Sequence, residues 1–187
     1  IGVFWKDYST RDNAALFQED SALPEPTQEG FREDSFTIDN CHIKNFSGDG
    51  VHLQNMFAFT LRNSMIIANG GRAGYLTGWD GWIHNCIMHT NCGAAIYSDG
   101  PFASFTILGN RMEWNHNGGI NIKHGGSLNI NNNCFDRAYG PAIQLRGGDW
   151  LSDGITVTGN IFRRSGKQRP DFAGDPYLNS HIYLRGA

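Results

Sequence analysis

The chain has 187 residues, which favours a single domain, and its 15 basic and 18 acidic residues give a formal net charge of −3 at pH 7. This balance argues against a nucleic-acid-binding module, which would carry a basic excess. With 40% hydrophobic and 18% charged residues, extended disorder is excluded, and no apolar run approaches the ~18 residues of a transmembrane helix.

Residues 1–34 contain no clear repeat, and we interpret them as an N-terminal flank or an incomplete coil of the repeat that follows. The chain begins with Ile1, and no apolar signal core follows it. The sequence is therefore interpreted as a mature product or a fragment of a longer chain.

From residue 35 onward a short motif recurs: Phe36-Thr-Ile-Asp-Asn-Cys41 returns as Phe59-Thr-Leu-Arg-Asn-Ser64 and as Phe105-Thr-Ile-Leu-Gly-Asn110. Its last position forms an anchor column with spacings of 22 to 27 residues: Cys41, Ser64, Cys86, Asn110, Asn133 and Asn160. The last unit carries an insertion, expected as a surface loop over Gly166 to Tyr177. A repeat of this length indicates a solenoid.

Apolar and polar residues alternate within each repeat, which indicates strands and not helices. One strand precedes the anchor, a second begins just after it, and a third starts ten residues later, at Val51, Gly74, Ile96, Ile120 and Ile143. Three short strands per coil, with no helix between them, predict an all-β parallel β-helix of about six coils over residues 35–187. The 24 glycines and 18 asparagines suit its many tight turns.

The anchor column falls between two strands with almost no residues to spare, so it must lie at a tight bend. Small polar side chains there can stack from coil to coil and satisfy the carbonyl groups of the bend. This asparagine stack, together with Gly-Ile-x-Leu strands, resembles the right-handed parallel β-helix proteins of the pectin-lyase-like superfamily. The resemblance covers residues 35–187 and implies a right-handed coil whose third strand face forms a polysaccharide cleft.

The four cysteines, Cys41, Cys86, Cys92 and Cys134, show no CxxC or zinc-type spacing, so we expect them to be unpaired. Cys41 and Cys86 share a column but lie two coils apart, too far for a disulfide. The sequence predicts no metal site and no cofactor.

Alternation in the third strand places two columns of side chains toward solvent. The first is His52, Tyr75, Tyr97, Asn121, Gln144 and Tyr183, and the second is Gln54, Thr77, Asp99, Lys123, Arg146 and Arg185. Aromatic rings stack on sugars, amides bind hydroxyls, and a row of cations binds carboxylate or sulfate groups. We therefore assign substrate binding to His52, Tyr75, Asn121, Gln144, Tyr183, Arg185 and the adjacent His124. The competing interpretation is that these side chains merely cover the sheet.

Catalytic candidates on this face are Asp99, Lys123, Arg146, Tyr97 and Asp80. Elimination from an acidic sugar needs a base for the proton next to the carboxylate and cations that stabilise the enolate. Hydrolysis would instead use two carboxylates about 5–9 Å apart, and Asp80 and Asp49 are the other acids nearby. The motifs typical of polygalacturonase-like hydrolases and of calcium pectate lyases are missing, so no named enzyme family is assigned.

Three functions are compatible with these residues. The leading hypothesis is a carbohydrate-active protein that cleaves a polysaccharide, presumed acidic, by elimination or hydrolysis. The second is a domain resembling phage tailspikes, which are usually trimers, and the third is a non-catalytic adhesive solenoid. Each places the protein outside the cell or on a virion surface, with a polysaccharide as partner and neither nucleic acid nor membrane. Because open solenoid ends expose strand edges, a homotrimer or further domains are expected to cap them.

Overall fold

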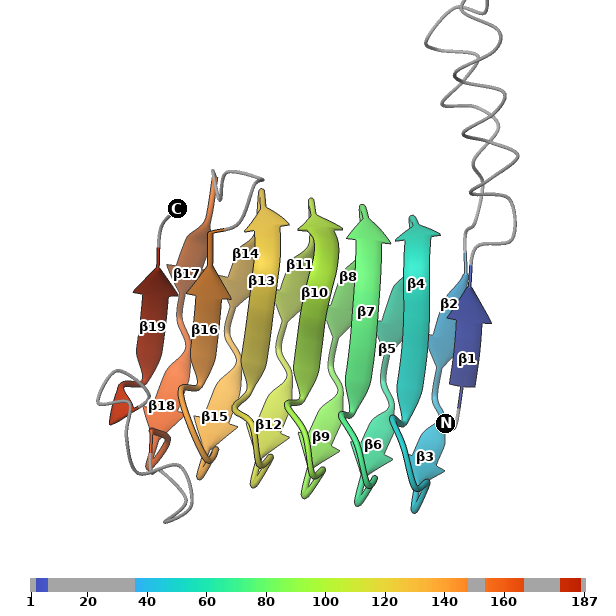
Figure 1. Cartoon of the computed structure of the whole chain (residues 1–187), viewed down its shortest axis with the longest axis horizontal. Coiled ribbons are helices and arrows are strands. Elements are labelled where there is room, and N and C mark those ends of the chain that lie inside the picture. Colours follow the sequence, from blue (N-terminus) through green and yellow to red (C-terminus); the bar gives the residue numbers. More distant parts are fainter. Residues whose placement is uncertain (1–2, 7–35, 148–153, 167–178, 186–187) are drawn as a thin grey trace, which may run out of the picture.

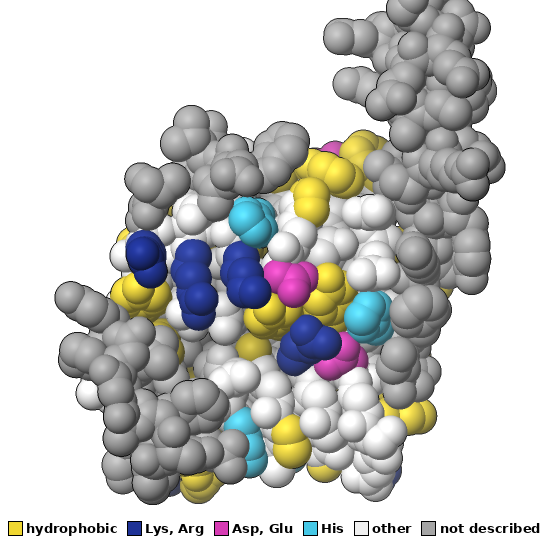
Figure 2. All heavy atoms as spheres, in the orientation of Figure 1, with side chains coloured by type: hydrophobic (Ala, Val, Ile, Leu, Met, Phe, Trp, Pro, Cys, Tyr) yellow, Lys and Arg dark blue, Asp and Glu magenta, His cyan; other side chains and the backbone are white. Residues whose placement is uncertain are grey.

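The computed structural model describes residues 3–6, 36–147, 154–166 and 179–185, and regular structure within them is almost entirely β-strand. The strands form three sheets that run along the long axis of the molecule (Figure 1). Sheet A faces the viewer, and its outer side chains fill the centre of Figure 2. Every strand pairing is parallel, which confirms the predicted parallel β-helix.

Each coil visits the sheets in the order B, C, A, and neighbouring strands in a sheet come from successive coils. Sheet A consists of β1 (Val3–Lys6), β4 (Val51–Phe57), β7 (Gly74–Trp79), β10 (Ile96–Ala103), β13 (Ile120–Gly126), β16 (Ile143–Arg146) and β19 (Ile182–Arg185). Sheet B consists of β2 (Thr37–Asp39), β5 (Thr60–Arg62), β8 (Trp82–His84), β11 (Thr106–Leu108), β14 (Asn129–Asn131) and β17 (Thr156–Thr158). Sheet C consists of β3 (His42–Lys44), β6 (Met65–Ile67), β9 (Ile87–His89), β12 (Arg111–Glu113), β15 (Cys134–Asp136) and β18 (Ile161–Arg163).

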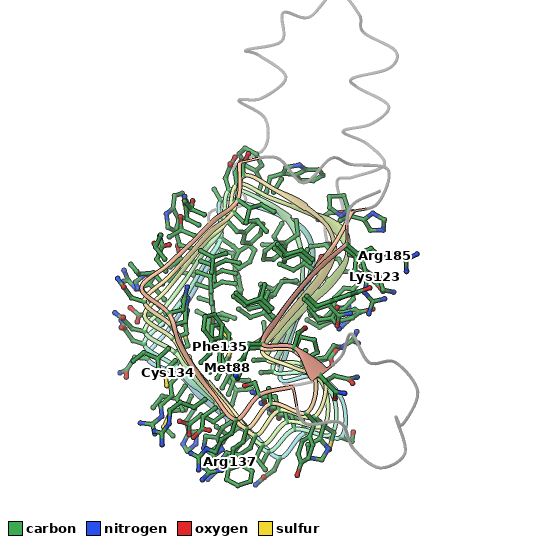
Figure 3. All side chains as sticks on the ribbon, turned by 90° about the vertical axis from the view of Figure 1, so that its left-hand side faces the viewer. Met88, Lys123, Cys134, Phe135, Arg137 and Arg185 are labelled. Atoms are coloured by element: carbon green, nitrogen blue, oxygen red, sulfur yellow. The ribbon has the colours of Figure 1, made fainter. Side chains whose placement is uncertain are left out.

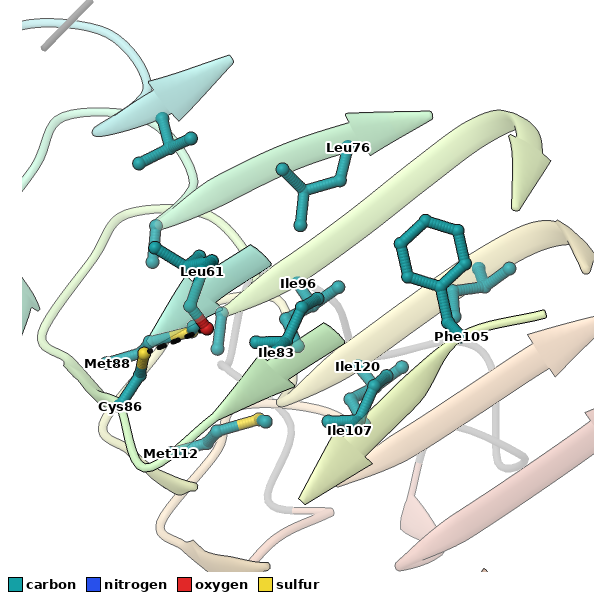
Figure 4. Packing of buried hydrophobic residues seen from close by; sticks show 14 of the residues in the cluster. Leu61, Leu76, Ile83, Cys86, Met88, Ile96, Phe105, Ile107, Met112 and Ile120 are labelled. Carbon is teal, nitrogen blue, oxygen red and sulfur yellow. Dashed lines mark hydrogen bonds between the residues drawn. The ribbon is translucent and has the colours of Figure 1, made fainter. Parts of the chain in front are cut away.

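The interior is filled by columns of apolar side chains, with one residue per coil from each of sheets B and C and up to three from sheet A. In sheet B the register pairs Leu61 with Ile83 and Ile83 with Ile107, all fully buried (Figure 4). Met88 of β9 and Phe135 of β15 point into the same interior from sheet C (Figure 3). Each such side chain contributes about 1.5–3 kcal/mol by leaving water, so the repeated apolar positions stabilise every coil.

Three corners per coil turn the chain, each with a residue in the left-handed region, where φ lies between 50° and 67° along the columns. The corner before the anchor uses asparagine or glycine throughout, which adopt this conformation at little cost. Its members are Asn40, Asn63, Asn85, Gly109, Asn132 and Gly159. The corner between sheets C and A holds Asn45, Ala68, Thr90, Trp114, Arg137 and Arg164. The abundance of glycine and asparagine thus has a conformational reason.

The predicted stack at the anchor column is confirmed as a ladder of amide hydrogen bonds. Asn110 Nδ2 donates to Asn133 Oδ1 at 3.0 Å, and Asn133 Nδ2 donates to Asn160 Oδ1 at 3.0 Å. In the first coils a hydroxyl takes this part, because Ser64 Oγ accepts from the backbone N–H of Cys41. These side chains therefore find their hydrogen-bond partners within the protein.

A second buried ladder, which the sequence analysis missed, lies at the corner between sheets C and A. Asn69 Nδ2 donates to Asn91 Oδ1, and Asn91 Nδ2 donates to Asn115 Oδ1, both at 2.9 Å. The spacings of 22 and 24 residues equal those of the anchor column, so the repeat register could have revealed it.

The remaining fold expectations concern the cysteines and the chain ends. Cys41, Cys86, Cys92 and Cys134 are all free, and burial raises the pKa of the Cys86 thiol to about 11. Strand β1 pairs with β4 and so extends sheet A, while residues 7–35 and all but the first residue of the expected Gly166–Tyr177 loop lie outside the described residues. The inward positions Ile182 and Leu184 of β19 are exposed, since β19 is the last strand in the order of sheet A.

Candidate functional site

The register of sheet A confirms that the residues of the first predicted column are aligned from strand to strand. Its residues are consecutive Cα partners across β4, β7, β10, β13, β16 and β19, namely His52, Tyr75, Tyr97, Asn121, Gln144 and Tyr183. Arg146 and Arg185 are partners in the second column. Figure 2 shows Lys and Arg side chains in a row across this face, with an acidic side chain at one end of the row.

The second column is less regular than predicted, because β4 and β10 shift register near its position. Thr77 is buried and not outward, as its Oγ1 accepts the backbone N–H of Asn55 at 2.9 Å. Asn55 has a φ of 53°, so the irregularity in β4 is a local bulge. The hydroxyl of Thr77 therefore serves the backbone of this bulge.

Asp99 is the centre of a hydrogen-bonded cluster on β10. It is exposed, and it accepts from Tyr75 Oη at 2.6 Å and from Tyr97 Oη at 3.3 Å. Burial, and next the hydrogen bond to Asp99, raise the pKa of the Tyr75 phenol, so Tyr75 stays a neutral donor. The two phenols hold the Asp99 carboxylate at the surface of β10, next to the strand that carries Lys123.

An ion pair between Asp49 and Arg72, which the sequence did not lead us to expect, packs against the rings of Tyr75 and Tyr97. Asp49, which is buried, accepts from Arg72 Nε at 2.8 Å and from Arg72 Nη2 at 2.9 Å. The Arg72 guanidinium lies 4.7 Å from the ring centre of Tyr75 and 4.8 Å from that of Tyr97. Asp49 and Arg72 are 23 residues apart, so the repeat register extended into the turn would have placed them side by side.

Asp49 is fixed in its ionised form. Burial would raise the pKa of its carboxyl, but hydrogen bonds from Arg72 and His52 outweigh this and lower it. His52 Nδ1 lies 3.1 Å from Asp49 Oδ2, and the His52 ring stacks on Tyr75 with centroids 4.3 Å apart. Asp49 is therefore a structural anion and a poor general acid.

The cationic side of the face begins at Lys123 of β13, whose Nζ lies 5.7 Å from the ring centre of Tyr97. Arg146 follows on β16. The Gln144 amide is oriented so that its Oε1 accepts a hydrogen bond from Arg146 Nε at 2.8 Å. Arg185 of β19 comes next, and Figure 3 shows that Lys123 and Arg185 project from the same face. Three positive groups thus follow the axis coil by coil.

Two predicted binding residues are buried, contrary to expectation, and a third has a buried ring nitrogen. Gln144 is only 4% exposed and holds Arg146 in place, and Asn121 is 9% exposed. Among the described residues, Asn121 Oδ1 and His124 Nδ1 are buried atoms without a hydrogen-bond partner. Such unpaired polar atoms are rare in folded proteins, and here two of them lie on β13, the strand of Lys123.

Asp80 lies apart from the strand face, at the corner between β7 and β8. Its φ is 55°, and its backbone N–H donates to the carbonyl of Ala103 at 3.1 Å. Aspartate tolerates this conformation better than most residues, so the chain reversal itself accounts for Asp80. The structure therefore brings Asp99, Tyr97, Lys123 and Arg146 together on sheet A and leaves Asp80 at the edge.

Within the described ranges, no group of three His, Cys, Asp or Glu side chains is placed to hold a metal ion. None of the described residues forms a helix of the length and apolarity that a membrane crossing requires. The site consists of one exposed carboxylate, phenol hydroxyls and a row of cations on a solenoid face.

Coils of three parallel strands, with asparagine ladders at their corners, define a parallel β-helix. A family model described as right handed beta helix region matches residues 30–169, about three quarters of the chain, so the protein belongs to this family. The family has many carbohydrate-active members and also members that are not enzymes. No curated protein and no solved structure matches the chain.

Proposed function

We propose that this protein is a polysaccharide lyase that cleaves an acidic polysaccharide on the outer face of sheet A. The observation that carries the proposal is the position of Asp99, held by two tyrosine hydroxyls at the head of a row of cations. Successive coils offer the same face at intervals of one strand spacing, about 4.8 Å, which suits an extended polymer.

Elimination fits this face better than hydrolysis because hydrolysis needs two carboxylates across the scissile bond. Of the described acidic residues near sheet A, Asp49 is locked to Arg72 and Asp80 forms a corner. Asp99 is thus the single exposed carboxylate that a described strand of sheet A presents. One carboxylate with adjacent cations is the set of groups that elimination requires.

In the proposed reaction, Lys123 and Arg146 bind the carboxylate of a uronate residue, and Arg146 can form paired hydrogen bonds to it. Asp99 takes the proton from the carbon next to that carboxylate, and the two cations stabilise the resulting enolate. The bond to the leaving oxygen breaks as a carbon–carbon double bond forms. Tyr97 donates its proton to the leaving oxygen and regains one from Asp99, to which it is hydrogen-bonded.

A turnover screen on polygalacturonate, alginate, hyaluronan and a neutral dextran tests the proposal, with reducing ends and the ultraviolet absorbance of unsaturated products read together. We expect both signals on an acidic polymer, and we expect Asp99→Asn to lower kcat at least ~100-fold. The matched control is Asp39→Asn, which changes a hydrogen-bonded aspartate on sheet B.

Each other outcome rejects the proposal in a distinct way. Reducing ends without absorbance would indicate hydrolysis and would direct attention to a second acid. Binding of the polymer without either signal would favour the adhesive solenoid. Equal losses in Asp99→Asn and Asp39→Asn would show that the effect is structural and not catalytic.

A further inference from the structure

A cavity away from the Lys123 row is used by none of the proposed chemistry. It lies at the corner between sheets C and A, has a volume of about 440 Å³, and is lined by Trp114, Arg137, Tyr139, Arg164, Ser165 and Gly166. Figure 3 shows Arg137 at a corner well away from Lys123 and Arg185. The volume falls in the range of small-molecule sites, about 300–1,000 Å³.

The cavity arises from the repeat itself, because Trp114, Arg137 and Arg164 occupy one corner position in three successive coils. Their φ values of 57°, 52° and 52° are in the left-handed region, which costs a bulky residue about 1–2 kcal/mol. The first coil has Asn45 at this position, which meets the same geometry at lower cost. Large side chains are therefore present where the backbone does not favour them.

Two guanidinium groups meet one buried carboxylate at the cavity. Asp136 is 4% exposed and accepts from Arg164 Nε at 2.9 Å, from Arg164 Nη2 at 2.5 Å and from Arg137 Nη1 at 3.3 Å. The Cα partners of Asp136 on either side, Arg163 of β18 and Glu113 of β12, add a third positive charge and a second negative charge. Each guanidinium has five N–H groups, so both cavity arginines retain donors, and positive charge exceeds negative charge here.

The aromatic groups of the cavity offer apolar faces next to these donors. The Arg137 guanidinium lies 4.4 Å from the ring centre of Trp114, and Trp114 is still 42% exposed. Tyr139 packs against the edge of His116 with centroids 5.3 Å apart. A ring for the apolar face of a sugar, next to guanidinium groups for its acidic substituent, is a pattern that recognises an acidic saccharide.

We propose that this corner cavity is a second saccharide-binding site, separate from sheet A, that takes a sugar residue bearing a carboxylate or a sulfate. Trp114 stacks on the sugar ring, and Arg137 and Arg164 bind the anionic group. The site binds without cleaving, since the described residues that line it include no carboxylate, and the neighbouring Asp136 is held by Arg137 and Arg164. It requires no activity of the Asp99 cluster.

The test measures binding of trigalacturonate, a sulfated disaccharide and neutral cellotriose to the full chain by calorimetry. Trp114→Asn removes the ring with a residue that suits the left-handed corner, and Arg137→Asn removes one guanidinium while Arg164 still holds Asp136. The matched control is Trp82→Thr: Trp82 on sheet B is 46% exposed, and its neighbours in the column are Thr60 and Thr106. With Lys123→Ala present in every variant to weaken the sheet A site, we expect both cavity variants to weaken binding of an acidic ligand at least tenfold, and the control to leave it unchanged.

Lys123→Ala separates this site from the lyase proposal, since acidic ligand still binds the cavity in that variant. If Lys123→Ala abolishes binding and Trp114→Asn does not, the inference is overturned and all binding lies on sheet A. If Trp114→Asn fails to fold, a nuclear magnetic resonance titration of the unaltered chain decides. The Trp114 indole signal shifts with acidic ligand and not with cellotriose, and the absence of a shift overturns the inference.

Discussion

The most direct test of the fold's internal logic is the replacement of Asn133 by alanine. Asn133 is buried at the centre of the anchor ladder, and its side chain makes four hydrogen bonds. Its Oδ1 accepts from the backbone N–H and the amide of Asn110, at 2.9 and 3.0 Å. Its Nδ2 donates to the carbonyl of Ile107 at 2.9 Å and to Asn160 Oδ1 at 3.0 Å.

The magnitude follows from these bonds. At about 1 kcal/mol net per bond, Asn133→Ala lowers the free energy of unfolding by about 4 kcal/mol, because the partners left behind are buried and find no water. Asn133→Ser is expected to lose less, since Ser64 already fills the equivalent position with one donated and one accepted bond. Ser64 thus shows how a serine at this position keeps some of the hydrogen bonds that alanine would lose.

The assay is equilibrium unfolding in denaturant, read by circular dichroism and by tryptophan fluorescence together. The control is Asn129→Ala, which removes an exposed asparagine whose Oδ1 accepts a single bond from Thr156 at 2.6 Å and is expected to cost under about 1 kcal/mol. Equal losses in the two alanine variants, or a loss under about 1 kcal/mol for Asn133→Ala, would refute the ladder as a source of stability.

Two further predictions concern pH and a close backbone approach. Hydrogen bonds and positive charges from arginines outweigh burial and keep the pKa values of Asp49 and Asp136 below the ordinary 3.8. The stability that these carboxylates contribute is therefore complete above that value and is lost as pH falls through the lower folded values. The denaturant midpoint should drop between about pH 4 and pH 2, and less so in Asp49→Asn. A flat midpoint would contradict this. Gly78→Ala should lower the thermal midpoint far more than Gly100→Ala. Gly78 has a φ of 138°, and its added Cβ would overlap the carbonyl oxygen of Met56, whereas the Cβ at Gly100 would meet the methyl group of Thr77 at 3.1 Å. Similar shifts of the thermal midpoint in both variants would count against this geometry.

The fold could be predicted from the sequence because a β-helix repeats one local rule. Alternation at Ile83 and Ile107 fixes which side chains enter the core, and the constant spacing of Asn110 and Asn133 fixes the register between coils. Once these are known, the first outward column and its register follow. The prediction failed at Thr77, where a bulge in the neighbouring strand changes the alternation that the rule assumes.

The candidate site was only partly predictable for a related reason. The repeat places Tyr75, Tyr97 and Asp99 on one face, but the contacts among their side chains depend on rotamers that spacing does not specify. The contribution of Arg72 was missed because it lies in a turn, where alternation gives no direction. The corner cavity depends likewise on left-handed residues, which bulky side chains seldom occupy.

The amide ladder has a direction. In both ladders the Nδ2 group belongs to the earlier coil and the Oδ1 group to the later one, so the amide dipoles align head to tail along the axis. Aligned amides polarise one another and strengthen the inner bonds. A coil that begins at Asn110 and ends before Asn133 is therefore an interchangeable module: duplicated in place, it would present the same acceptor to the coil before it and the same donor to the coil after it. Elongation of the rod by whole coils leaves this polarity intact, whereas a coil without the asparagine would divide one polarised chain into two shorter ones.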